Sequence, residues 1–411
     1  MEWMDYIYLG MYWFMIYTTV LFMLVFIKNR KYLWLSPEVK EKKTISFIVP
    51  AYNEEKNIAR CIDSLLSLDY PKDKVEIFVV NDGSTDRTRE ICERYAREGK
   101  IKLINKKNSG KASSINMVLP MTKGELVAVL DADSVVSKDY VNHMIGYFED
   151  ERVAAVTPAI KPLDANNIVK KIQWVEYMFQ IYLRKAFDFF KAQYVIPGAG
   201  SIYRGDVIRR LKFDENGNLT EDTEIGFRMH EKGYEIRNSL NAVVYTDIPD
   251  TFGSLVKQRL RWYRGYLQNV RKYSYMILNR KFGNLGMFLI PANFIWITIL
   301  FLLVILPGIN LANDLYIRYL NWAAVDFEII WPSFNPDTIF LSLGMYNYYG
   351  VLFLSLTFLT LFIGAKASKE ELGLIKKRAH YFAYIFLYPM LITFFWVSAT
   401  IQELLKVERK W

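Results

Sequence analysis

Long uncharged apolar runs lie near both ends of the chain, and most of its charged residues lie between them. The first run covers residues 6–27, which is enough to cross a bilayer because about 20 apolar residues span the hydrocarbon core. Three more runs of this kind lie further on, at residues 285–309, 341–364 and 381–401. The pattern predicts a water-facing domain that is preceded by one membrane helix and followed by several.

The distribution of basic residues predicts how these helices are oriented. Six basic residues follow the first run closely, namely Lys28, Arg30, Lys31, Lys40, Lys42 and Lys43. Excess Lys and Arg marks the cytoplasmic side of a membrane protein, and the basic segment 366–380 marks it a second time. We therefore expect an integral plasma-membrane protein with a cytosolic central domain. Four crossings would put the charged C-terminus outside, against this bias, so one apolar segment could instead be re-entrant or interfacial, with part of 312–340 the main candidate.

Short β-branched runs alternate with helical stretches from residue 45 onward. Four of these runs are predicted to be buried strands, at residues 45–49, 75–80, 101–104 and 125–130. Helical segments are expected between them, near residues 54–68, 86–97 and 111–119. Alternation of this kind predicts crossover units and a mostly parallel, Rossmann-like sheet. In such sheets ligands bind beyond the C-terminal ends of the strands.

A pair of aspartates follows the fourth predicted strand. Asp131 and Asp133, in the segment DAD, are one residue apart at the edge of the sheet where a ligand is expected. Two carboxylates in this position can hold Mg²⁺ or Mn²⁺ and leave coordination positions for a diphosphate. A lone D-x-D arises by chance about once in a chain of this length. The position at a strand end is therefore what favours a functional role.

Other ligand candidates follow the first three strands. In the segments PAYNEE and NDGSTD, Glu54 and Asp82 are placed to hydrogen-bond a base or a ribose, and Tyr52 can stack on a base. Lys111 begins a helix, where free backbone N–H groups and a cation suit a phosphate. NDGS by itself is more often only a turn, so these residues gain meaning from their shared place at the edge of the sheet.

The second half of the central domain offers an acceptor side. In the segment VIPGAGSIYRGD, Gly198 and Gly200 let the backbone approach a ligand closely. In LTEDTEIGFRM, Thr220 can cap a helix whose first turn holds Glu221 and Asp222. Acidic residues in a first helical turn are ordinary stabilisers. By themselves these residues favour helix capping over catalysis.

Two stretches predict helices at the membrane surface. The charged, aromatic stretch 167–193 has the composition of an amphipathic interfacial helix, and a core-packing helix is the alternative. In the basic segment QRLRW, Gln258, Arg261 and Trp262 are spaced at i, i+3 and i+4 and so share one helical face. Arg259 is then left for the interface or for neighbouring carboxylates. The alternative is a juxtamembrane basic patch that binds anionic lipid headgroups.

Charge and cysteine content argue against two other classes of protein. The formal net charge of +9 does not indicate a nucleic-acid-binding protein, because basic loops beside the membrane runs account for much of it. The aromatic residues also lie in apolar runs rather than among basic residues. Cys61 and Cys92 lack the spacing of metal ligands and are expected to be free thiols.

The motifs PAYNEE, NDGSTD, DAD, PGAGSIYR, TED and QRLRW, in this order, resemble those of family 2 glycosyltransferases of GT-A fold. The resemblance is to the membrane-integrated processive β-glycosyltransferases, which include cellulose, chitin, hyaluronan and poly-N-acetylglucosamine synthases. It covers about residues 44–270, and TED followed by QRLRW is its specific pair. DAD replaces the DSD of several members, and one span precedes the domain where many members have two.

The resemblance implies an α/β GT-A cytosolic domain and an α-helical transmembrane region with interfacial amphipathic helices. Four parts are expected: a transmembrane helix at 1–30, the glycosyltransferase domain at 31–250, interfacial helices carrying QRLRW at 251–282, and about three spans at 283–411.

The resemblance also implies roles for the matching residues. Asp222 would be the general base that takes the proton of the acceptor hydroxyl. The nucleotide-sugar would be bound by Tyr52, Glu54, Asp82, Lys111, Asp131, Asp133, Gln258 and Arg261. Asp131 and Asp133 would also hold Mg²⁺ or Mn²⁺. The acceptor would lie against Gly200, Ser201, Glu221 and Trp262.

The function expected from these roles is an inverting transfer from a UDP-sugar to the end of a growing β-linked polysaccharide. UDP-GlcNAc is the preferred donor and UDP-Glc the second choice. The product would leave through the protein's own membrane helices. A single transfer to a lipid, such as a polyprenyl phosphate or ceramide, is the alternative. A transporter or channel with a nucleotide-binding domain would leave Asp222 without a role.

Overall fold

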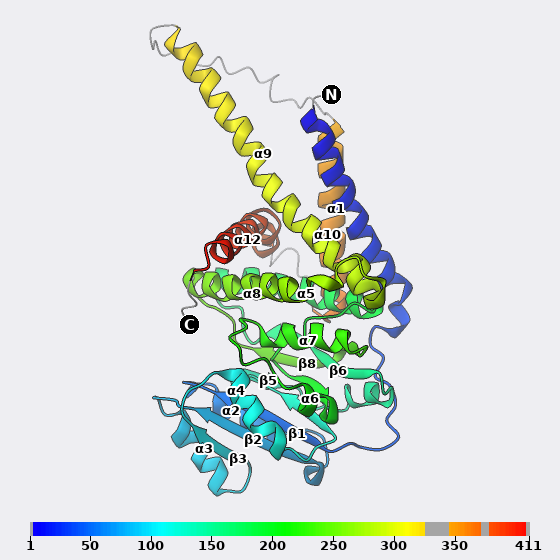
Figure 1. Ribbon diagram of the computed structural model, residues 1–411, viewed down its shortest axis with the longest axis vertical. Helices are drawn as coiled ribbons and strands as arrows, with labels where there is room; N and C mark the ends of the chain where they lie inside the picture. The colour runs from blue at the N-terminus through cyan, green and yellow to red at the C-terminus, as the bar shows by residue number, and fades with distance from the viewer. Residues whose placement is uncertain (1–2, 325–344, 371–377, 408–411) are drawn as a thin grey trace.

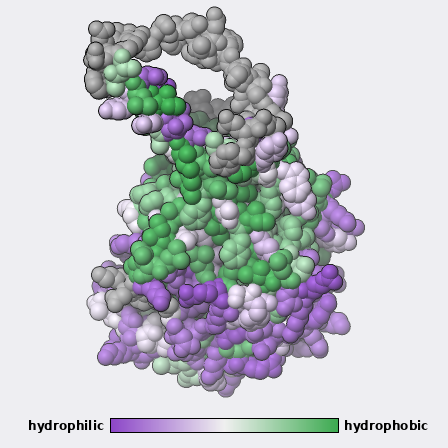
Figure 2. All heavy atoms as spheres, turned by 45° about the horizontal axis from the view of Figure 1, so that its top comes forward, coloured by the Kyte–Doolittle hydropathy of each residue, from purple (hydrophilic) through white to green (hydrophobic). Residues whose placement is uncertain are grey.

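The computed structural model describes residues 3–324, 345–370 and 378–407, and it shows a sheet domain with a bundle of helices standing on it (Figure 1). Apolar side chains gather over the helical part, whereas polar side chains cover the sheet domain (Figure 2). This separation is the one expected for a membrane region next to a water-facing domain.

The domain is built on one mixed sheet of eight strands. The strands are β1 Ile45–Ala51, β2 Val75–Asp82, β3 Lys102–Lys106, β4 Leu126–Val129, β5 Ser134–Val136, β6 Val153–Pro162, β7 Ser201–Arg204 and β8 Glu235–Thr246. They lie in the order β3-β2-β1-β4-β7-β6-β8-β5. Strands β3, β2, β1 and β4 are parallel to one another, and β6 is parallel to β8. In contrast, β7 and β5 run antiparallel to their neighbours. The predicted GT-A-like, mostly parallel sheet is confirmed.

Both faces of the sheet are covered, as the continuous apolar strands predict. Phe47 and Val49 of β1 pack with helices α2 (Ile58–Leu66) and α3 (Thr88–Arg97) on one face. Ile48 faces the opposite way and packs with α4 (Lys111–Val118), α6 (Gly205–Leu211) and α7 (Glu221–Glu231). Because β1, β2 and β4 are parallel, the loops that follow them meet at one edge of the sheet.

Two long helices lie crosswise between the sheet domain and the membrane helices (Figure 1). They are α5 (Ile168–Phe189) and α8 (Phe252–Lys272). α5 is tied to the sheet because Asp188, fully buried, pairs with Arg237 of β8 at 2.6 Å and with Lys185 at 2.7 Å. Its other side packs on the membrane helix α10 (Met345–Ala367) through Val175 and Met178. α5 is thus packed in the core between the sheet and α10, and its place at a membrane surface stays a prediction.

Four helices in the described residues are long and apolar enough to cross a membrane. They are Met4–Lys28, Leu285–Ala323, Tyr348–Ala367 and His380–Leu404, which overlap α1 (Trp3–Lys28), α9 (Ile290–Ala323), α10 (Met345–Ala367) and α12 (Tyr388–Leu404). A π-helical turn, Leu285–Leu289, leads into α9, and the short α11 (Arg378–Phe382) and a second π-helical turn lead into α12. Most of the segment 312–340 lies outside the described residues, because α9 ends at Ala323 and residues 325–344 are not described.

α12 is not oriented like α1, α9 and α10. The hydroxyl of Tyr388, at its start, accepts a hydrogen bond from Arg259 of α8 at 3.4 Å. Glu403, at its end, pairs with Arg264 of the same helix at 2.7 Å. Arg264 also donates to the carbonyl oxygen of Val407 at 2.9 Å. α12 therefore runs alongside the crosswise helix α8, and both of its ends contact that helix.

Candidate active site

A cavity of about 530 Å³ opens where the sheet domain meets the helices. Its floor is formed by the residues after β4 and the start of α7, and its walls are formed by α5 and α8. The cavity continues to membrane helices, because Trp296 and Leu300 of α9 and Trp396 of α12 also line it. We call it the central cavity. It joins the polar edge of the sheet to the apolar part of the molecule.

The loops after β1 and β2 are fastened to each other, and Tyr52, Glu54 and Asp82, which they carry, are not among the residues that line the cavity. Asn53, which has a positive φ of 56°, accepts a hydrogen bond from the backbone N–H of Thr85 at 2.8 Å. Its own backbone N–H donates to the Ser84 hydroxyl at 3.0 Å. Gly83 has a φ of +73° and lies against Asn108, so a side chain there would collide with the backbone. Tyr52, on the first loop, is half exposed and free to stack on a ligand.

Asp82 is buried beneath the loop that leads into α4. Its carboxylate pairs with Lys106 at 2.6 Å and accepts backbone N–H groups from Ser109 at 3.0 Å and from Gly110 at 2.9 Å. These contacts fix the start of α4, and hence the position of Lys111. A contact between Asp82 and the uridine stays a prediction.

Lys111 and Asp131 form an ion pair at the floor of the central cavity. The Glu221 carboxylate also lies near this pair, with its Oε1 3.8 Å from the Lys111 Nζ. Burial alone would lower the pKa of Lys111. The neighbouring carboxylates of Asp131, Glu221 and Asp222 together have a larger, opposite effect, so the pKa is raised and the side chain stays protonated. A side chain at Gly198 would collide with Lys111 Nζ. Glycine at this position thus makes room for the ion pair.

Asp133 is the second carboxylate of the pair predicted to hold a metal. Burial, together with the charge of Asp131, raises the pKa of Asp133 to about 7. Its Oδ1 accepts hydrogen bonds from Ser134 at 3.0 Å and from Thr246 at 3.3 Å. Burial and nearby carboxylates also raise the pKa of Glu54. An excess of negative charge at this edge of the sheet is a setting that a divalent cation would relieve.

The side chains of Asp131 and Asp133 limit how a metal ion can be bound in the central cavity. The described residues contain no group of three or more His, Cys, Asp or Glu that converge to hold a metal ion. Asp131 and Asp133 supply two hard oxygen ligands, which suits a cation such as Mg²⁺ that takes its remaining ligands from phosphate and water. The residues fit a metal that binds together with a diphosphate, rather than a metal held by the protein alone.

Glu221 and Asp222 begin α7 and face the central cavity. Thr220 holds the N-cap position, but the prediction that its hydroxyl caps the helix is wrong. That hydroxyl instead accepts a hydrogen bond from Asn269 of α8 at 3.1 Å. Asp222 Oδ1 accepts from the backbone N–H of Thr223 at 2.7 Å. Burial, partly offset by Lys111, raises the pKa of Glu221.

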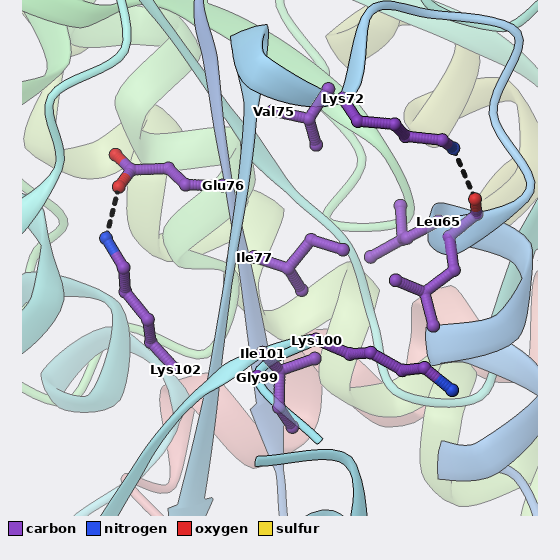
Figure 3. A pocket seen from close by; sticks show the side chains of 10 residues that line it. Leu65, Lys72, Val75, Glu76, Ile77, Gly99, Lys100, Ile101 and Lys102 are labelled. Carbon is purple, nitrogen blue, oxygen red and sulfur yellow. Dashed lines mark hydrogen bonds and ion pairs between the residues drawn. The ribbon is translucent and has the colours of Figure 1, made fainter. Parts of the chain in front are cut away.

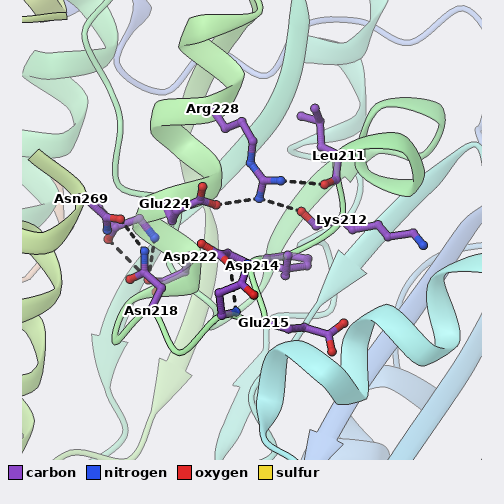
Figure 4. A network of polar contacts seen from close by, with 12 residues as sticks. Leu211, Lys212, Asp214, Glu215, Asn218, Asp222, Glu224, Arg228 and Asn269 are labelled. Atoms are coloured by element: carbon purple, nitrogen blue, oxygen red, sulfur yellow. Dashed lines mark hydrogen bonds and ion pairs between the residues drawn. The ribbon is translucent and has the colours of Figure 1, made fainter. Parts of the chain in front are cut away.

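A polar network behind the cavity holds α7 in place (Figure 4). Glu224, which is fully buried, pairs with Arg228 at 2.6 Å and with Lys272 of α8 at 2.9 Å. Arg228 in turn donates to the carbonyl oxygens of Leu211 and Lys212 at 2.8 and 2.9 Å. The three acidic residues of the segment TEDTE therefore have different roles. Glu224 holds α7 in place, whereas Glu221 and Asp222 face the cavity.

The segment PGAGS borders the cavity with its first residues only. Pro197, Gly198 and Ala199 line the cavity, and Gly200 and Ser201 lie behind them. Gly200 has a φ of +81°, and its backbone N–H donates to Val129 of β4 at 2.9 Å. Ser201 is fully buried and donates its hydroxyl to the Pro197 carbonyl oxygen. The structure thus brings Gly198, rather than Gly200 or Ser201, to the place expected for a ligand.

The residues of QRLRW face two ways. Gln258, Arg261 and Trp262 line the central cavity, as their i, i+3, i+4 spacing predicts. Arg261 is exposed and has no ion-pair partner among the residues that the structure describes. Arg259 is fully buried, pairs with Glu176 of α5 at 2.6 Å and lies 4.2 Å from the ring centre of Trp262.

Several residues of the cavity were not expected from the sequence. Arg184 and Gln180 project into it from α5, and Asn293 and Trp296 line it from the first turns of α9. Trp396 of α12 stacks on Tyr263 with a ring separation of 4.4 Å. The interfacial character predicted for 167–193 was the available signal for α5. No local pattern marks the others, because their faces are set by how distant helices pack.

A second hollow, of about 260 Å³, lies at the opposite edge of the sheet, between β2 and β3 (Figure 3). Its polar groups are used within the protein: Glu76 pairs with Lys102 at 2.7 Å, and Lys72 donates to the carbonyl oxygen of Leu68 at 3.1 Å. It lies away from the carboxylates of the central cavity. We therefore assign the chemistry to the central cavity.

Comparisons with known proteins agree with this geometry. Residues 46–211 match the model of the family described as glycosyl transferase family 2. A poly-beta-1,6-N-acetyl-D-glucosamine synthase of Staphylococcus epidermidis is 30% identical over 246 residues, which cover 58% of this chain and 59% of that protein. The synthase of the same description from Staphylococcus aureus strain COL is 30% identical over 230 residues, 55% of either chain. The chain thus matches less than two thirds of the length of these relatives.

One solved structure resembles nearly the whole chain. The mannosyltransferase PcManGT from Pyrobaculum calidifontis, in complex with GDP-Man and Mn²⁺, has a TM-score of 0.57 and 20% identity. The match covers 87% of this chain and 98% of that one. At this identity the likeness shows the fold alone, and it extends beyond the sheet domain into the helical part.

Proposed function

We propose that the chain is a family 2 glycosyltransferase that performs an inverting sugar transfer from a UDP-sugar, because residues 46–211 match that family's model and several helices are of membrane type. The acceptor is the end of a growing β-linked polysaccharide. One observation carries the proposal: a single cavity contains Asp131, Asp133 and Asp222 and continues to Trp296 of α9 and Trp396 of α12. The place of transfer therefore adjoins a path into the membrane.

The donor binds at the edge of the sheet in this proposal. Tyr52, Glu54 and Asp82 serve the uridine, and Lys111, Gln258 and Arg261 serve the diphosphate. Asp131 and Asp133 would hold the Mg²⁺ or Mn²⁺ ion. Such a cation neutralises charge that develops on the departing diphosphate. Two observations support this arrangement: Lys111 already lies against a carboxylate of that pair, and Arg261 has no ion-pair partner among the described residues.

Asp222 acts as the general base. The Thr223 N–H fixes its Oδ1 at 2.7 Å, so Oδ2 is the atom proposed to take the proton of the acceptor hydroxyl. The acceptor oxygen forms a bond to the anomeric carbon as the bond from that carbon to the diphosphate oxygen breaks. UDP leaves from the opposite side, and the configuration inverts to β. Glu221 and Trp262 line the same cavity and are assigned to the acceptor, as is Gly198 in place of Gly200 and Ser201.

The donor is proposed to be UDP-GlcNAc, with UDP-Glc as second choice. The curated relatives are described as poly-beta-1,6-N-acetyl-D-glucosamine synthases, which supports an N-acetylglucosamine polymer. The protein is proposed to reside in the plasma membrane with the sheet domain in the cytosol, and its product to leave along α9 from the part of the cavity that Trp296 and Trp396 line. Trp296 and Trp396 support this path, because aromatic faces suit sugar rings.

A single transfer to a lipid acceptor is the second candidate. The same observation favours it, because a cavity that reaches membrane helices could also admit a polyprenyl phosphate or a ceramide. Both candidates are tested with the full chain in detergent or nanodiscs, incubated with labelled UDP-GlcNAc, UDP-Glc, UDP-GlcA or GDP-Man. UDP release together with a high-molecular-weight product supports polymer synthesis. One labelled sugar in the organic phase supports the lipid reaction and contradicts the polymer.

A further inference from the structure

Arg184 is a cation in the central cavity that the transfer reaction described above does not use. It lies on α5, near Gln180 and Tyr177, on the wall that borders the membrane helices. The neighbouring Leu183 and Phe187 pack in the same apolar cluster as Ile297 of α9. Arg184 is thus placed on the membrane side of the cavity, across from the carboxylates that follow β4.

A chain of hydrogen bonds along α5 fixes this side chain. Arg184 donates to Gln180 Oε1 at 3.1 Å, and Gln180 Nε2 donates to Glu176 Oε1 at 2.9 Å. Glu176 Oε2 pairs with the buried Arg259 at 2.6 Å. Because these residues recur every four positions, they share one face of the helix. The amide of Gln180 can neutralise no charge, and the carboxylate of Glu176 is already paired with Arg259.

Arg184 therefore has no ion-pair partner among the residues that the structure describes. A guanidinium carries five N–H donors, and within the described part of the chain one hydrogen bond from it is formed, to Gln180. Burial lowers the pKa of Arg184, with the charges of Tyr177, Asp222 and Glu176 acting in the opposite direction. Arg184 is half-buried, so its unused donors remain available to a ligand in the cavity that supplies acceptors.

The position of Arg184 relative to Asp222 identifies the ligand. The two opposite charges attract each other across the cavity without forming an ion pair. A group between the base and the membrane helices belongs to the acceptor, because the donor lies on the strand side with Asp131 and Lys111. Resting on the proposed function, we propose that Arg184 binds the terminal sugar of the acceptor through an oxygen that only accepts hydrogen bonds, and that it disfavours a terminal sugar bearing a free amine.

The chemistry of the guanidinium defines which substituents meet this requirement. It donates and never accepts, so an amide carbonyl, as in an N-acetyl group, and a carboxylate, as in a uronic acid, both suit it. A protonated amine offers donors only and repels the cation. Arg184 would therefore set acceptor specificity without taking part in the bond changes at the anomeric carbon.

The test compares three acceptors of equal length in the purified full chain, with UDP release as the measurement. The acceptors are a β-linked N-acetylglucosamine oligosaccharide, the same compound with its terminal sugar de-N-acetylated, and one that ends in a uronic acid. For wild type we expect the free amine to be used at least about 10-fold less well than the better of the other two. Which of those two is preferred tells whether a carbonyl or a carboxylate is the natural partner.

Arg184→Gln should raise the KM for the preferred acceptor by about 10- to 100-fold, the worth of a hydrogen bond to a charged group. It should reduce discrimination against the amine and leave the donor KM unchanged. Arg184→Lys keeps the charge and should keep the discrimination. Lys171→Gln removes a cation from the same helix outside the cavity and is the matched control for both variants.

Two results would overturn the inference. A rise in the donor KM with the acceptor KM unchanged would make Arg184 a diphosphate ligand. Equal use of all three acceptors by wild type and by Arg184→Gln would leave it without a role in specificity. If Arg184→Gln fails to fold, loss of discrimination in Arg184→Lys would also contradict the inference. Wild-type protein that transfers from no donor would instead contradict the proposed function itself.

Discussion

The Arg259 guanidinium lies 2.6 Å from the Glu176 carboxylate, and both side chains are buried where α5, α8 and α12 meet. Tyr388 accepts a further hydrogen bond from the same guanidinium at 3.4 Å. One of the two arginines of QRLRW therefore joins three helices, whereas the other, Arg261, faces the cavity. The motif combines a structural arginine with a ligand-binding one.

Arg259→Ala is expected to destabilise the protein rather than to affect catalysis selectively. Removing the cation would leave Glu176 buried without its partner, which costs about 3–5 kcal/mol. A lower melting temperature and loss of folded protein in detergent are the expected readings. Lys257→Ala removes an exposed cation from the same helix and should leave both unchanged. A wild-type melting temperature for Arg259→Ala would show that the buried pair contributes nothing.

Arg261→Ala should have the opposite effect. Arg261 is exposed and pairs with no described residue, so the fold and the melting temperature should be retained. Loss of its contact to the diphosphate should lower kcat/KM for the donor by about 10- to 100-fold. Steady-state kinetics with UDP release will measure the change, again with Lys257→Ala as control. Equal, small losses in both variants would indicate a basic patch for lipid headgroups.

Asp222→Asn should abolish transfer while leaving the protein folded. An amide cannot take the acceptor proton, and loss of a general base lowers rates by about 10²- to 10⁴-fold. Asn at this position can still accept the Thr223 N–H, so the start of α7 should persist. Asp206→Asn, an exposed change on α6, is the control. Unchanged transfer in Asp222→Asn would remove the central residue of the mechanism.

The floor of the cavity could be predicted because its residues follow from local patterns. Buried strands of a parallel sheet end at one edge, so Asp131 and the loops of Tyr52 and Asp82 follow neighbouring strand ends, although only Asp131 of these lines the cavity. The helical spacing in QRLRW likewise placed Gln258, Arg261 and Trp262 on one face. These arguments need only the period of a strand or a helix.

The walls of the cavity could not be predicted in the same way. Arg184 is one of several polar residues on an amphipathic helix, and only the packing of α5 against α10, α1 and the sheet decides that it faces the cavity. The Thr220 hydroxyl matched a capping pattern, yet Gly265 lets α8 approach so closely that Asn269 takes that hydroxyl instead. Contacts between distant helices override the local pattern in both cases.

Transfer should require a divalent cation. Asp131 and Asp133 provide two protein ligands, and among the described residues no third acidic, His or Cys side chain completes a site. Metal should therefore bind weakly without the nucleotide and be removed by EDTA, with activity restored by Mg²⁺ or Mn²⁺. Asp133→Asn should raise the metal concentration needed for half-maximal activity. Asp206→Asn should not, and full activity of wild type in EDTA would contradict a metal role.

The C-terminus should lie on the same side of the membrane as the sheet domain. His380–Leu404 is long and apolar enough to cross, but Tyr388 and Glu403 both contact α8, which lies crosswise beneath the upright helices (Figure 1). A helix that crossed would carry Glu403 about 22 Å away from Tyr388 along the membrane normal, beyond reach of Arg264. We therefore predict that α12 is interfacial and that α1, α9 and α10 cross. The basic loop 366–380 and the charged C-terminus then share the cytoplasmic side, as the positive-inside rule requires.

Cysteine labelling can test this topology, because Cys61 and Cys92 are both buried and should react little. Lys406→Cys introduces a thiol at an exposed position after α12, Arg97→Cys marks the sheet domain, and Asn310→Cys marks the far part of α9. With a membrane-impermeant maleimide, the first two should react in inside-out vesicles and stay unlabelled in intact cells. Asn310→Cys should show the reverse. If Lys406→Cys behaves like Asn310→Cys, α12 crosses the membrane, and the contacts of Arg264 with Glu403 and Val407 do not persist in the bilayer.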